Sequence, residues 1–332
     1  MRRDGLLLAI DGGQTATKSL LARFDGEVLA AGRGGPFDHF HTAAGTARNR
    51  AAIHGAVGSA LAAAGARAEE VVAVGLGLTG VFSGVDSTPL VAPIVREVLD
   101  PRHVTVVADF VTNLAGASGG EPGVVVIAGG GAIAYGVTAD GREWVSSGFG
   151  YLIGDEGGAF DIGRRAVAAA ARASDGRDPP TALEEVVTST FGLGGMRDVT
   201  RVVYGEGFTR DRLSLLVPLV VEAARAGDAA AGRIVTAAGE ELAGAALAVI
   251  RRLHRPGAPV AIYPTGGVFQ AGAILIEPFR AALYRGWPEA TDRAPAYPPV
   301  VGALILARRA IGMEADAGWL AAVAASLPMV ER

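Results

Sequence analysis

The sequence contains no cysteine, and Lys18 is the only lysine among its 332 residues. Without cysteine, the chain forms no disulfide, iron–sulfur cluster or thiolate zinc site. With one lysine outside any such motif, it has neither a G-x-x-x-x-G-K-[ST] phosphate loop nor the lysine of a protein kinase. Only Lys18 could form a Schiff base. If this protein uses ATP, it binds it through another architecture.

Aromatic residues make up only 6% of the chain, and the net charge of −4 comes from scattered rather than clustered residues. The cores must therefore consist of alanine, valine and leucine, and no nucleic-acid or membrane-surface footprint is visible. No apolar run is long enough to span a bilayer, and the run that ends at Asp11 is too short for a signal peptide. We expect a cytoplasmic protein that acts on a small soluble substrate.

Length and hydrophobicity suffice for two domains. Up to residue 117 strand and helix signals alternate, which indicates an α/β domain. A linker-like segment follows, and at Val124 the order of apolar strand, glycine-rich tip, strand and Asp-Gly turn begins again. We interpret this as a repeat of architecture rather than of residues. The stretch from Gly157 to Leu253 is expected to be mostly helical.

Three glycine-rich tips each follow an apolar strand: Gly12-Gly13, Gly129–Gly131 and Gly266-Gly267. Glycines let the backbone approach a phosphate, neighbouring amides form an anion nest, and a carboxylate such as Asp11 holds magnesium through water. An ordinary Asp-Gly-Gly turn is the alternative. Asp109 ends another apolar strand, where it is either a catalytic base or the N-cap of the next helix.

Two further patterns suggest competing chemistry. The segment 124–134, VVVIAGGGAIA, satisfies the G-x-G-x-x-A dinucleotide fingerprint, with Asp155 about twenty positions later. That fingerprint must open a helix, whereas Ile133–Val137 is typical of a strand, so an NAD-linked oxidoreductase is the weaker interpretation. His39 and His41 would share a strand face, but two imidazoles without further ligands more often mark a loop than a metal site.

Together these motifs resemble the sugar kinase, heat-shock-protein and actin superfamily, and within it the branch of N-acetylglucosamine kinases and benzoyl-CoA-reductase-activase type ATPases. The resemblance covers nearly the whole chain, and its most branch-specific part is GFGYLIGDEGG at 148–158. It implies an α/β fold of two ribonuclease-H-like domains with a nucleotide cleft between them, the actin-like ATPase fold. The implied domains are 1–117, with helices in 300–332 packing back on it, and 118–299 with a helical insertion.

The resemblance also implies an activity: transfer of the γ-phosphate of ATP to a hydroxyl of an amino sugar, with N-acetylglucosamine as the leading candidate. The expected cofactors are ATP and Mg²⁺, and the expected assembly is a homodimer. Asp109 would accept the proton of the attacking hydroxyl, and Asp11 would hold the metal through water. The implied phosphate and ATP contacts are Asp11, Gly12, Gly13, Gln14, Thr15, Lys18, Gly129, Gly130, Gly131, Gly266 and Gly267. The implied substrate contacts are Asp38, Asp109, Phe149, Gly150 and Asp155.

Several of these positions keep a second interpretation, and the substrate side departs from the branch. Lys18 could be a solvated strand residue, and Asp155 a loop or helix-start residue favoured by the helix dipole. Gly130 and Ala132 replace hydroxyls usual in the second tip, Asp38 stands near a usual Asn, and Phe149 replaces a common Trp. Such losses can change discrimination by orders of magnitude. Glucosamine, N-acetylmuramic acid and glucose remain alternative substrates, and a non-catalytic sugar or nucleotide sensor remains an alternative function.

Overall fold

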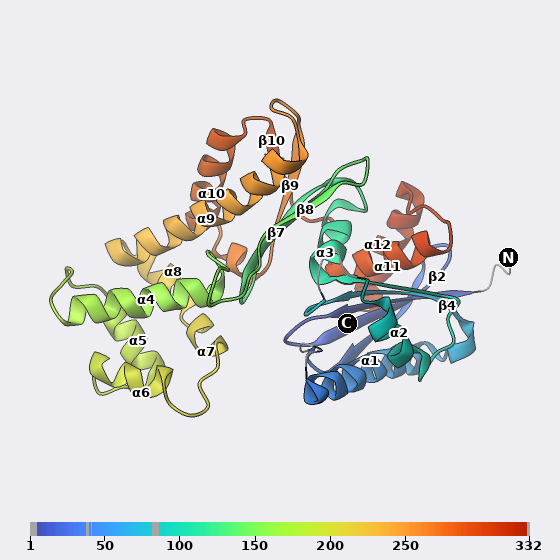
Figure 1. The fold of residues 1–332 in the computed structure, drawn as a ribbon, viewed down its shortest axis with the longest axis horizontal. Helices are drawn as coiled ribbons and strands as arrows, with labels where there is room; N and C mark the ends of the chain where they lie inside the picture. The colour runs from blue at the N-terminus through green and yellow to red at the C-terminus, as the bar shows by residue number, and fades with distance from the viewer. Residues whose placement is uncertain (1–4, 38–39, 41, 82–85, 331–332) are drawn as a thin grey trace. The chain divides into compact units, whose positions relative to one another are not determined.

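The computed structural model describes residues 5–37, 40, 42–81 and 86–330, which belong to two compact units (Figure 1). Unit 1 comprises Met1–Pro122 and Ala294–Arg332, and unit 2 comprises Gly123–Arg293. Unit 1 is therefore discontinuous in sequence, and unit 2 is inserted between its two parts. Each unit has its own sheet and its own core.

The boundaries differ from the expected 117/118 and 299/300. Helix α3 extends to Ser118, one residue past the expected end of that domain. The segment before the last two helices also bonds to α3: Ala296 N donates to Ala117 O at 2.9 Å, and Tyr297 N to Gly116 O at 3.2 Å. These bonds place residues 294–299 in unit 1.

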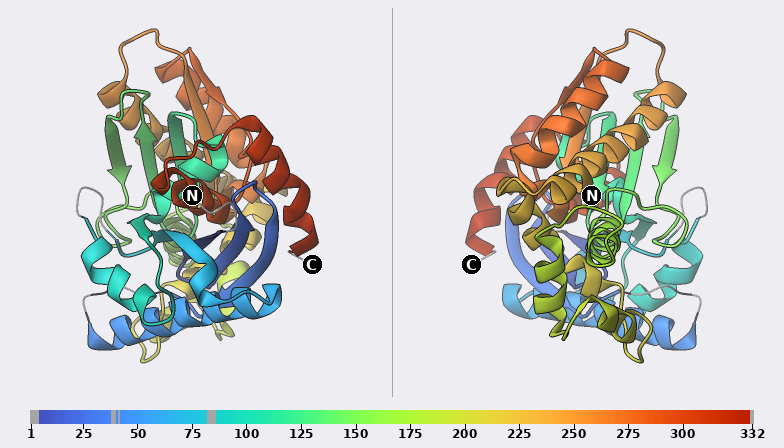
Figure 2. Two further views of the ribbon diagram at one scale, coloured as in Figure 1. Left: turned by 90° about the vertical axis from the view of Figure 1, so that its right-hand side faces the viewer. Right: turned by 90° about the vertical axis from the view of Figure 1, so that its left-hand side faces the viewer.

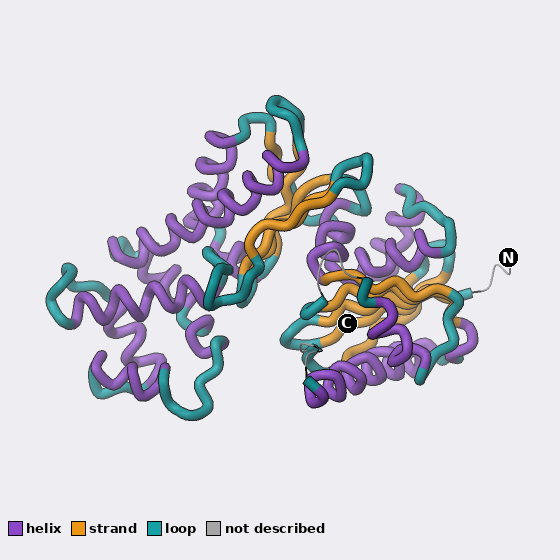
Figure 3. The backbone as a smooth tube through the Cα atoms, viewed as in Figure 1, coloured by secondary structure: helices purple, strands orange, loops and turns teal. Residues whose placement is uncertain are grey.

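Unit 1 contains a sheet with the strand order β3-β2-β1-β4-β5. The pairs β1–β2 and β2–β3 are antiparallel, and β1–β4 and β4–β5 are parallel. Helices lie on both sides of this sheet (Figure 3). The elements are β1 (Leu6–Gly12), β2 (Thr17–Arg23), β3 (Val28–Gly34), α1 (Ala43–Ala64), a 3₁₀ turn (Ala68–Glu70), β4 (Val71–Leu78), α2 (Thr88–Arg96), β5 (His103–Ala108), α3 (Asp109–Ser118), α11 (Pro299–Ala310) and α12 (Ala317–Val330).

Strand β1 is the centre of unit 1. Residues 6–10, LLLAI, are buried throughout, because β1 has a strand on each side and helices above and below. Helix α1 packs on β3 and β2, whereas α11 packs on β1, β4 and α3. In both views of Figure 2, α11 and α12 at the red end of the chain lie beside the blue strands. Val300 and Leu304 of α11 thereby share a core with Leu7 and Ala9 of β1.

Unit 2 contains a sheet with the order β10-β9-β6-β7-β8. Its central strand again has antiparallel partners on one side, in β6–β7 and β7–β8, and parallel partners on the other, in β6–β9 and β9–β10. The two sheets therefore share one topology, as the repeat in the sequence predicted. The strands are β6 (Gly123–Ala128), β7 (Ala132–Val137), β8 (Glu143–Ser147), β9 (Val260–Thr265) and β10 (Ala290–Asp292).

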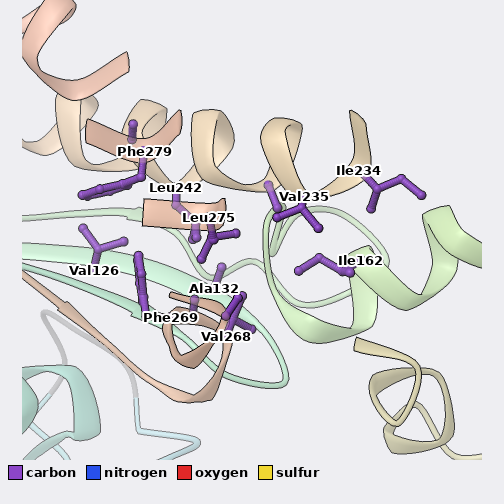
Figure 4. Close-up of a cluster of buried hydrophobic side chains, with 14 of the residues drawn as sticks. Val126, Ala132, Ile162, Ile234, Val235, Leu242, Val268, Phe269, Leu275 and Phe279 are labelled. Atoms are coloured by element: carbon purple, nitrogen blue, oxygen red, sulfur yellow. The ribbon is translucent and has the colours of Figure 1, made fainter. Parts of the chain in front are cut away.

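The remainder of unit 2 is helical, as expected. Figure 4 shows its core, in which Val126 of β6 lies among side chains of α9, α10 and the turn after β9, including Leu242, Leu275 and Phe269. The helical elements are α4 (Ala159–Ser174), α5 (Leu183–Phe191), a 3₁₀ turn (Met196–Asp198), α6 (Val199–Val203), α7 (Asp211–Ser214), α8 (Val217–Arg225), α9 (Ala229–Leu253), a 3₁₀ turn (Gly267–Ala271) and α10 (Ala273–Gly286).

None of the helices in the described part of the chain combines the length and apolarity that a membrane span requires.

Candidate active site

The first tip, Gly12-Gly13, opens the turn of residues 13–16 that joins β1 to β2 in unit 1. Asp11 lies directly opposite Lys18 in the ladder between these strands. Gly13 N donates to Ala16 O at 3.1 Å, which closes a tight turn, and residues 14 and 15 at its apex are exposed. The structure thus forms the hairpin that the sequence predicted, with a carboxylate at its base.

Two of the predicted site residues meet at one edge of the unit 1 sheet. Strands β1, β4 and β5 are parallel and end together, with Gly12 paired to Leu78 and Leu78 to Ala108. Asp11 and Asp109 therefore both lie at the carboxyl ends of these strands. Burial, together with the charge of Asp109, raises the pKa of Asp11 to about 6. Burial also raises the pKa of Asp109, so for both carboxylates the loss of solvation disfavours the ionised form.

Thr79 is a site residue that the sequence analysis missed. Its backbone N donates to Gly12 O at 2.9 Å, which ties the end of β4 to the first tip. Its hydroxyl bonds to the carboxylate of Asp109 and partly offsets the effect of burial on the pKa of Asp109. The same rule that placed Asp11 and Asp109 at one edge applies to Thr79, because Thr79 directly follows a parallel strand.

The alternative role of Asp109, as the N-cap of a helix beginning near residue 111, is wrong. Helix α3 begins at Asp109 itself, and Ala108 is its N-cap. The carboxylate of Asp109 accepts a bond from Phe110 N in the first turn, where a negative charge is favoured by the helix dipole. The side chain therefore lies at the sheet edge and at a helix N-terminus together.

Lys18 is exposed on β2, and its charge lowers the pKa of Asp11 against the larger effect of burial. It contributes electrostatically at the base of the first tip. A direct contact of Lys18 with a phosphate remains a prediction.

In unit 2 the second tip, Gly129–Gly131, and the third tip, Gly266-Gly267, lie side by side. The parallel pairing of β6 with β9 brings their ends together. A Cβ on Gly266, whose φ is +98°, would lie 2.3 Å from Ala128 O, so this close approach requires glycine. The second tip leads into strand β7 (Ala132–Val137) instead of a helix, and the dinucleotide interpretation is therefore wrong.

Asp155 lies against the second tip in the same unit. Its side chain is buried, with the residue 6% exposed, and its carboxylate accepts a bond from Gly150 N at 3.3 Å and one from Ala132 N. Burial raises the pKa of Asp155, and the bond from Gly150 N and the charge of Arg210 partly oppose that rise. Unit 2 thus brings together the second tip, the third tip and Asp155.

The remaining predicted substrate contacts are less defined. Phe149 is 74% exposed and Gly150 follows it in the loop that bonds to Asp155. Asp38, His39 and His41 lie outside the residues that the structure describes. The structure therefore does not test a substrate contact at Asp38 or a metal at the histidines.

The profile of the BadF/BadG/BcrA/BcrD ATPase family matches residues 8–307. The chain belongs to this family. It is 29% identical over 91% of its length to an N-acetylmuramic acid/N-acetylglucosamine kinase of Clostridium acetobutylicum, of which 98% is covered. It is 26% identical, also over 91% of its length, to an N-acetyl-D-glucosamine kinase of Dictyostelium discoideum, of which 97% is covered.

Among solved structures, a protein of Chromobacterium violaceum that is proposed to be an N-acetylglucosamine kinase matches this ATPase family member with a TM-score of 0.73. The two are 29% identical, and the match covers 91% of this chain and 98% of the other. The resemblance and the fold class predicted from the sequence are confirmed.

Proposed function

We propose that this family member is an ATP-dependent amino-sugar kinase, with N-acetylglucosamine as its leading substrate. The observation that carries the proposal is the pair Asp11 and Asp109 at one edge of the unit 1 sheet, both with raised pKa values. One carboxylate suits a metal site and the other a catalytic base, and phosphoryl transfer requires both. The relatives' activities on N-acetylated amino sugars support this choice of substrate.

Asp109 would accept the proton of the attacking hydroxyl. The hydroxyl oxygen forms a bond to the γ-phosphorus, the bond from that phosphorus to the bridging oxygen of ADP breaks, and ADP leaves. Asp109 must be ionised to accept the proton, so its raised pKa predicts loss of activity on the acid side at a higher pH than for an ordinary aspartate.

The residues present fit a magnesium ion. Asp11 and Asp109 repel each other in a partly buried site, and a cation would relieve that repulsion. Asp11 would hold Mg²⁺ through water, as the sequence predicted. Bound Mg²⁺ would supply positive charge that stabilises the phosphate oxygens during transfer.

The backbone of the tips would bind the nucleotide. The proposed phosphate contacts are, in unit 1, Gly12, Gly13, Gln14 and Thr15, with Lys18 nearby, and, in unit 2, the second tip. The third tip would accept adenine and ribose against its backbone. The proposed substrate contacts are those expected from the sequence, namely Asp38, Phe149, Gly150 and Asp155 in addition to the base.

A sugar screen with purified protein tests the function. ADP release should depend on an added amino sugar, and N-acetylglucosamine should exceed glucosamine, N-acetylmuramic acid, N-acetylmannosamine and glucose in kcat/KM. Nucleotide binding measured in parallel by calorimetry separates inactive from misfolded protein. If ATP binds but none of these sugars causes ADP release, the kinase assignment is overturned and a sensor function is favoured.

The proposal includes a homodimer in the cytoplasm, where ATP is abundant. Light scattering after size-exclusion chromatography gives the mass in solution, and a mass of a single chain would overturn the dimer.

A further inference from the structure

Asp155 makes its contacts with two separate segments of unit 2. One segment is the second tip together with the first residue of β7: Ala132 N donates to the carboxylate, and Gly131 lies against it. A Cβ on Gly131 would lie 2.2 Å from Asp155 Oδ2, so only glycine leaves room for this carboxylate. The other segment is the loop 148–154, here called the apolar loop, where Gly150 N donates to Oδ1 at 3.3 Å.

The backbone around Asp155 follows the second tip closely. Ala159 N donates to Gly129 O at 2.8 Å, and Phe160 N donates to Gly130 O at 3.1 Å. The start of α4 thus caps the carbonyls of the tip. Asp155 itself has a φ of +63°, a conformation that residues with a side chain rarely adopt. Its surroundings hold it in that conformation, as is common at functional sites.

The apolar loop has little packing of its own. Phe149, Leu152 and Ile153 are 74%, 83% and 79% exposed. Tyr151 does pack, edge-on against Phe160 with ring centroids 4.8 Å apart. The Arg210 guanidinium also lies 5.9 Å from the centroid of the Tyr151 ring, and Gly148 lies against the Ile133 side chain. The bond from Gly150 N to Asp155 adds a hydrogen bond between the loop and a side chain outside it. The carboxylate therefore helps to set the position of the loop.

We propose that Asp155 is a positioning residue that fastens the apolar loop to the second tip, so that the two segments are held in one arrangement. This role differs from the sugar contact that the family resemblance implied for Asp155. The kinetic part of the inference rests on the proposed function, in which the tip binds phosphate and the loop lies on the substrate side. The structural part stands on the contacts alone.

Chymotrypsin cleavage of the ligand-free protein tests the structural part. Phe149, Tyr151 and Leu152 are cleavage sites in the apolar loop, and Tyr204, which is 86% exposed, gives an internal reference in the same digest. Asp155→Asn keeps the size of the side chain but removes one acceptor and places an amide near backbone N–H donors. We expect cleavage in the loop, relative to Tyr204, to rise about tenfold, because proteolysis follows the population of the open segment.

Substitutions in the tip separate the contact from general glycine flexibility. The methyl group of Gly131→Ala would overlap the carboxylate of Asp155. Although residue 131 lies outside the apolar loop, this variant should raise loop cleavage as much as Asp155→Asn. Gly130→Ala meets no atom within 4 Å and should leave loop cleavage unchanged. Because one contact underlies both effects, Gly131→Ala combined with Asp155→Asn should not exceed either single change.

The neighbouring carboxylate provides the charge control. The charge of Glu156 repels that of Asp155 and raises the pKa of Asp155, and Glu156→Gln removes this negative charge from the same turn. Loop cleavage should stay at the wild-type ratio. Circular dichroism and thermal unfolding establish that each variant is folded before digestion, and Gly131→Ala keeps the test available if Asp155→Asn does not fold.

Kinetics distinguish fastening from a sugar contact alone. Fastening predicts that Asp155→Asn raises KM for ATP and for the sugar together, whereas a sugar contact raises only the sugar KM. Unchanged loop cleavage in Asp155→Asn and Gly131→Ala would overturn the inference. Absence of sugar-dependent ADP release in the wild type would overturn the proposed function and leave the cleavage result intact, so the two failures are distinguishable.

Discussion

The two units have the same strand order and strand directions, yet they present different chemistry at the same edge of the sheet. Unit 1 places Asp11 and Asp109 there, two carboxylates whose pKa values are raised. Unit 2 places two glycine tips there, with a single carboxylate that is occupied by backbone N–H groups. The same sheet topology therefore positions charged side chains in unit 1 and closely packed glycine backbone in unit 2.

This difference explains why the units should respond differently to substitution. A charged side chain can be changed with little effect on the backbone, so changes in unit 1 should affect the chemistry more than the fold. A glycine in close contact cannot accept a Cβ, so changes at Gly131 and Gly266 in the unit 2 tips should affect stability first. The following predictions are ordered by expected size.

The largest effect is expected for Asp109→Asn in unit 1. Removing a general base costs about 10²–10⁴ in rate, so kcat for sugar-dependent ADP release should fall by that factor. ATP affinity should change little, because the amide keeps the shape of the side chain. Stopped-time ADP assays and calorimetry measure the two quantities, and turnover near that of the wild type would remove Asp109 from the mechanism.

The next effect is expected for Gly266→Ala in unit 2. The new Cβ would lie 2.3 Å from Ala128 O at a φ of +98°, and such strain costs about 1–3 kcal/mol. Urea unfolding should show this loss in the free energy of unfolding. The matched variant Gly267→Ala meets no atom within 4 Å and should remain within about 0.5 kcal/mol of the wild type. Equal stability of the two variants would contradict the contrast between the units.

A smaller effect is expected for Thr79→Val. The change removes the hydroxyl that lowers the pKa of Asp109, so that pKa should rise and the acid limb of kcat/KM should move to higher pH. At a pH on this limb, activity should fall, by less than in Asp109→Asn. Thr79→Ser, which keeps the hydroxyl, should restore the wild-type profile. A profile that does not move in Thr79→Val would mean that the hydroxyl does not act on the base.

The smallest effect is expected for the charge around Asp11. Its pKa of about 6 means that it is mostly protonated below that pH, so Mg²⁺ should bind more tightly at pH 8 than at pH 5. Lys18→Met removes a charge that lowers the pKa of Asp11, so the pH at which Mg²⁺ affinity is half-maximal should rise. The rise should be a fraction of a pH unit, because Lys18 is exposed and solvent screens its charge. Calorimetric titration with Mg²⁺ and ATP at several pH values measures both. Identical midpoints would exclude an influence of Lys18.

The parts of the structure that could be predicted from the sequence are those with strong local patterns. Apolar strands followed by glycines gave the three tips, and the repeated order of elements indicated the shared topology. Strand β8 was not predicted, because its sequence EWVSS mixes polar and apolar residues at a sheet edge. Strand β10 has only three residues, too few for a periodic signal.

Site contacts were harder to predict than the site residues. Asp109 could be identified from its place after a strand, but its bond to Thr79 joins residues thirty positions apart and depends on the parallel pairing of β4 with β5. The occupation of the Asp155 carboxylate by Gly150 and Ala132 depends on a positive φ that no sequence pattern indicates for aspartate. Long-range pairing and unusual backbone conformation thus account for what was missed.

The division of unit 1 between the two ends of the chain has a consequence for biosynthesis. Residues 123–293 contain all of unit 2, so this unit can fold while the ribosome is still adding the last helices. Leu7 and Ala9 of β1 must wait for Val300 and Leu304 before their shared core is complete. The carboxylates proposed for catalysis therefore lie in the unit that is finished last, and a nascent chain would have its second and third tips in place before its base.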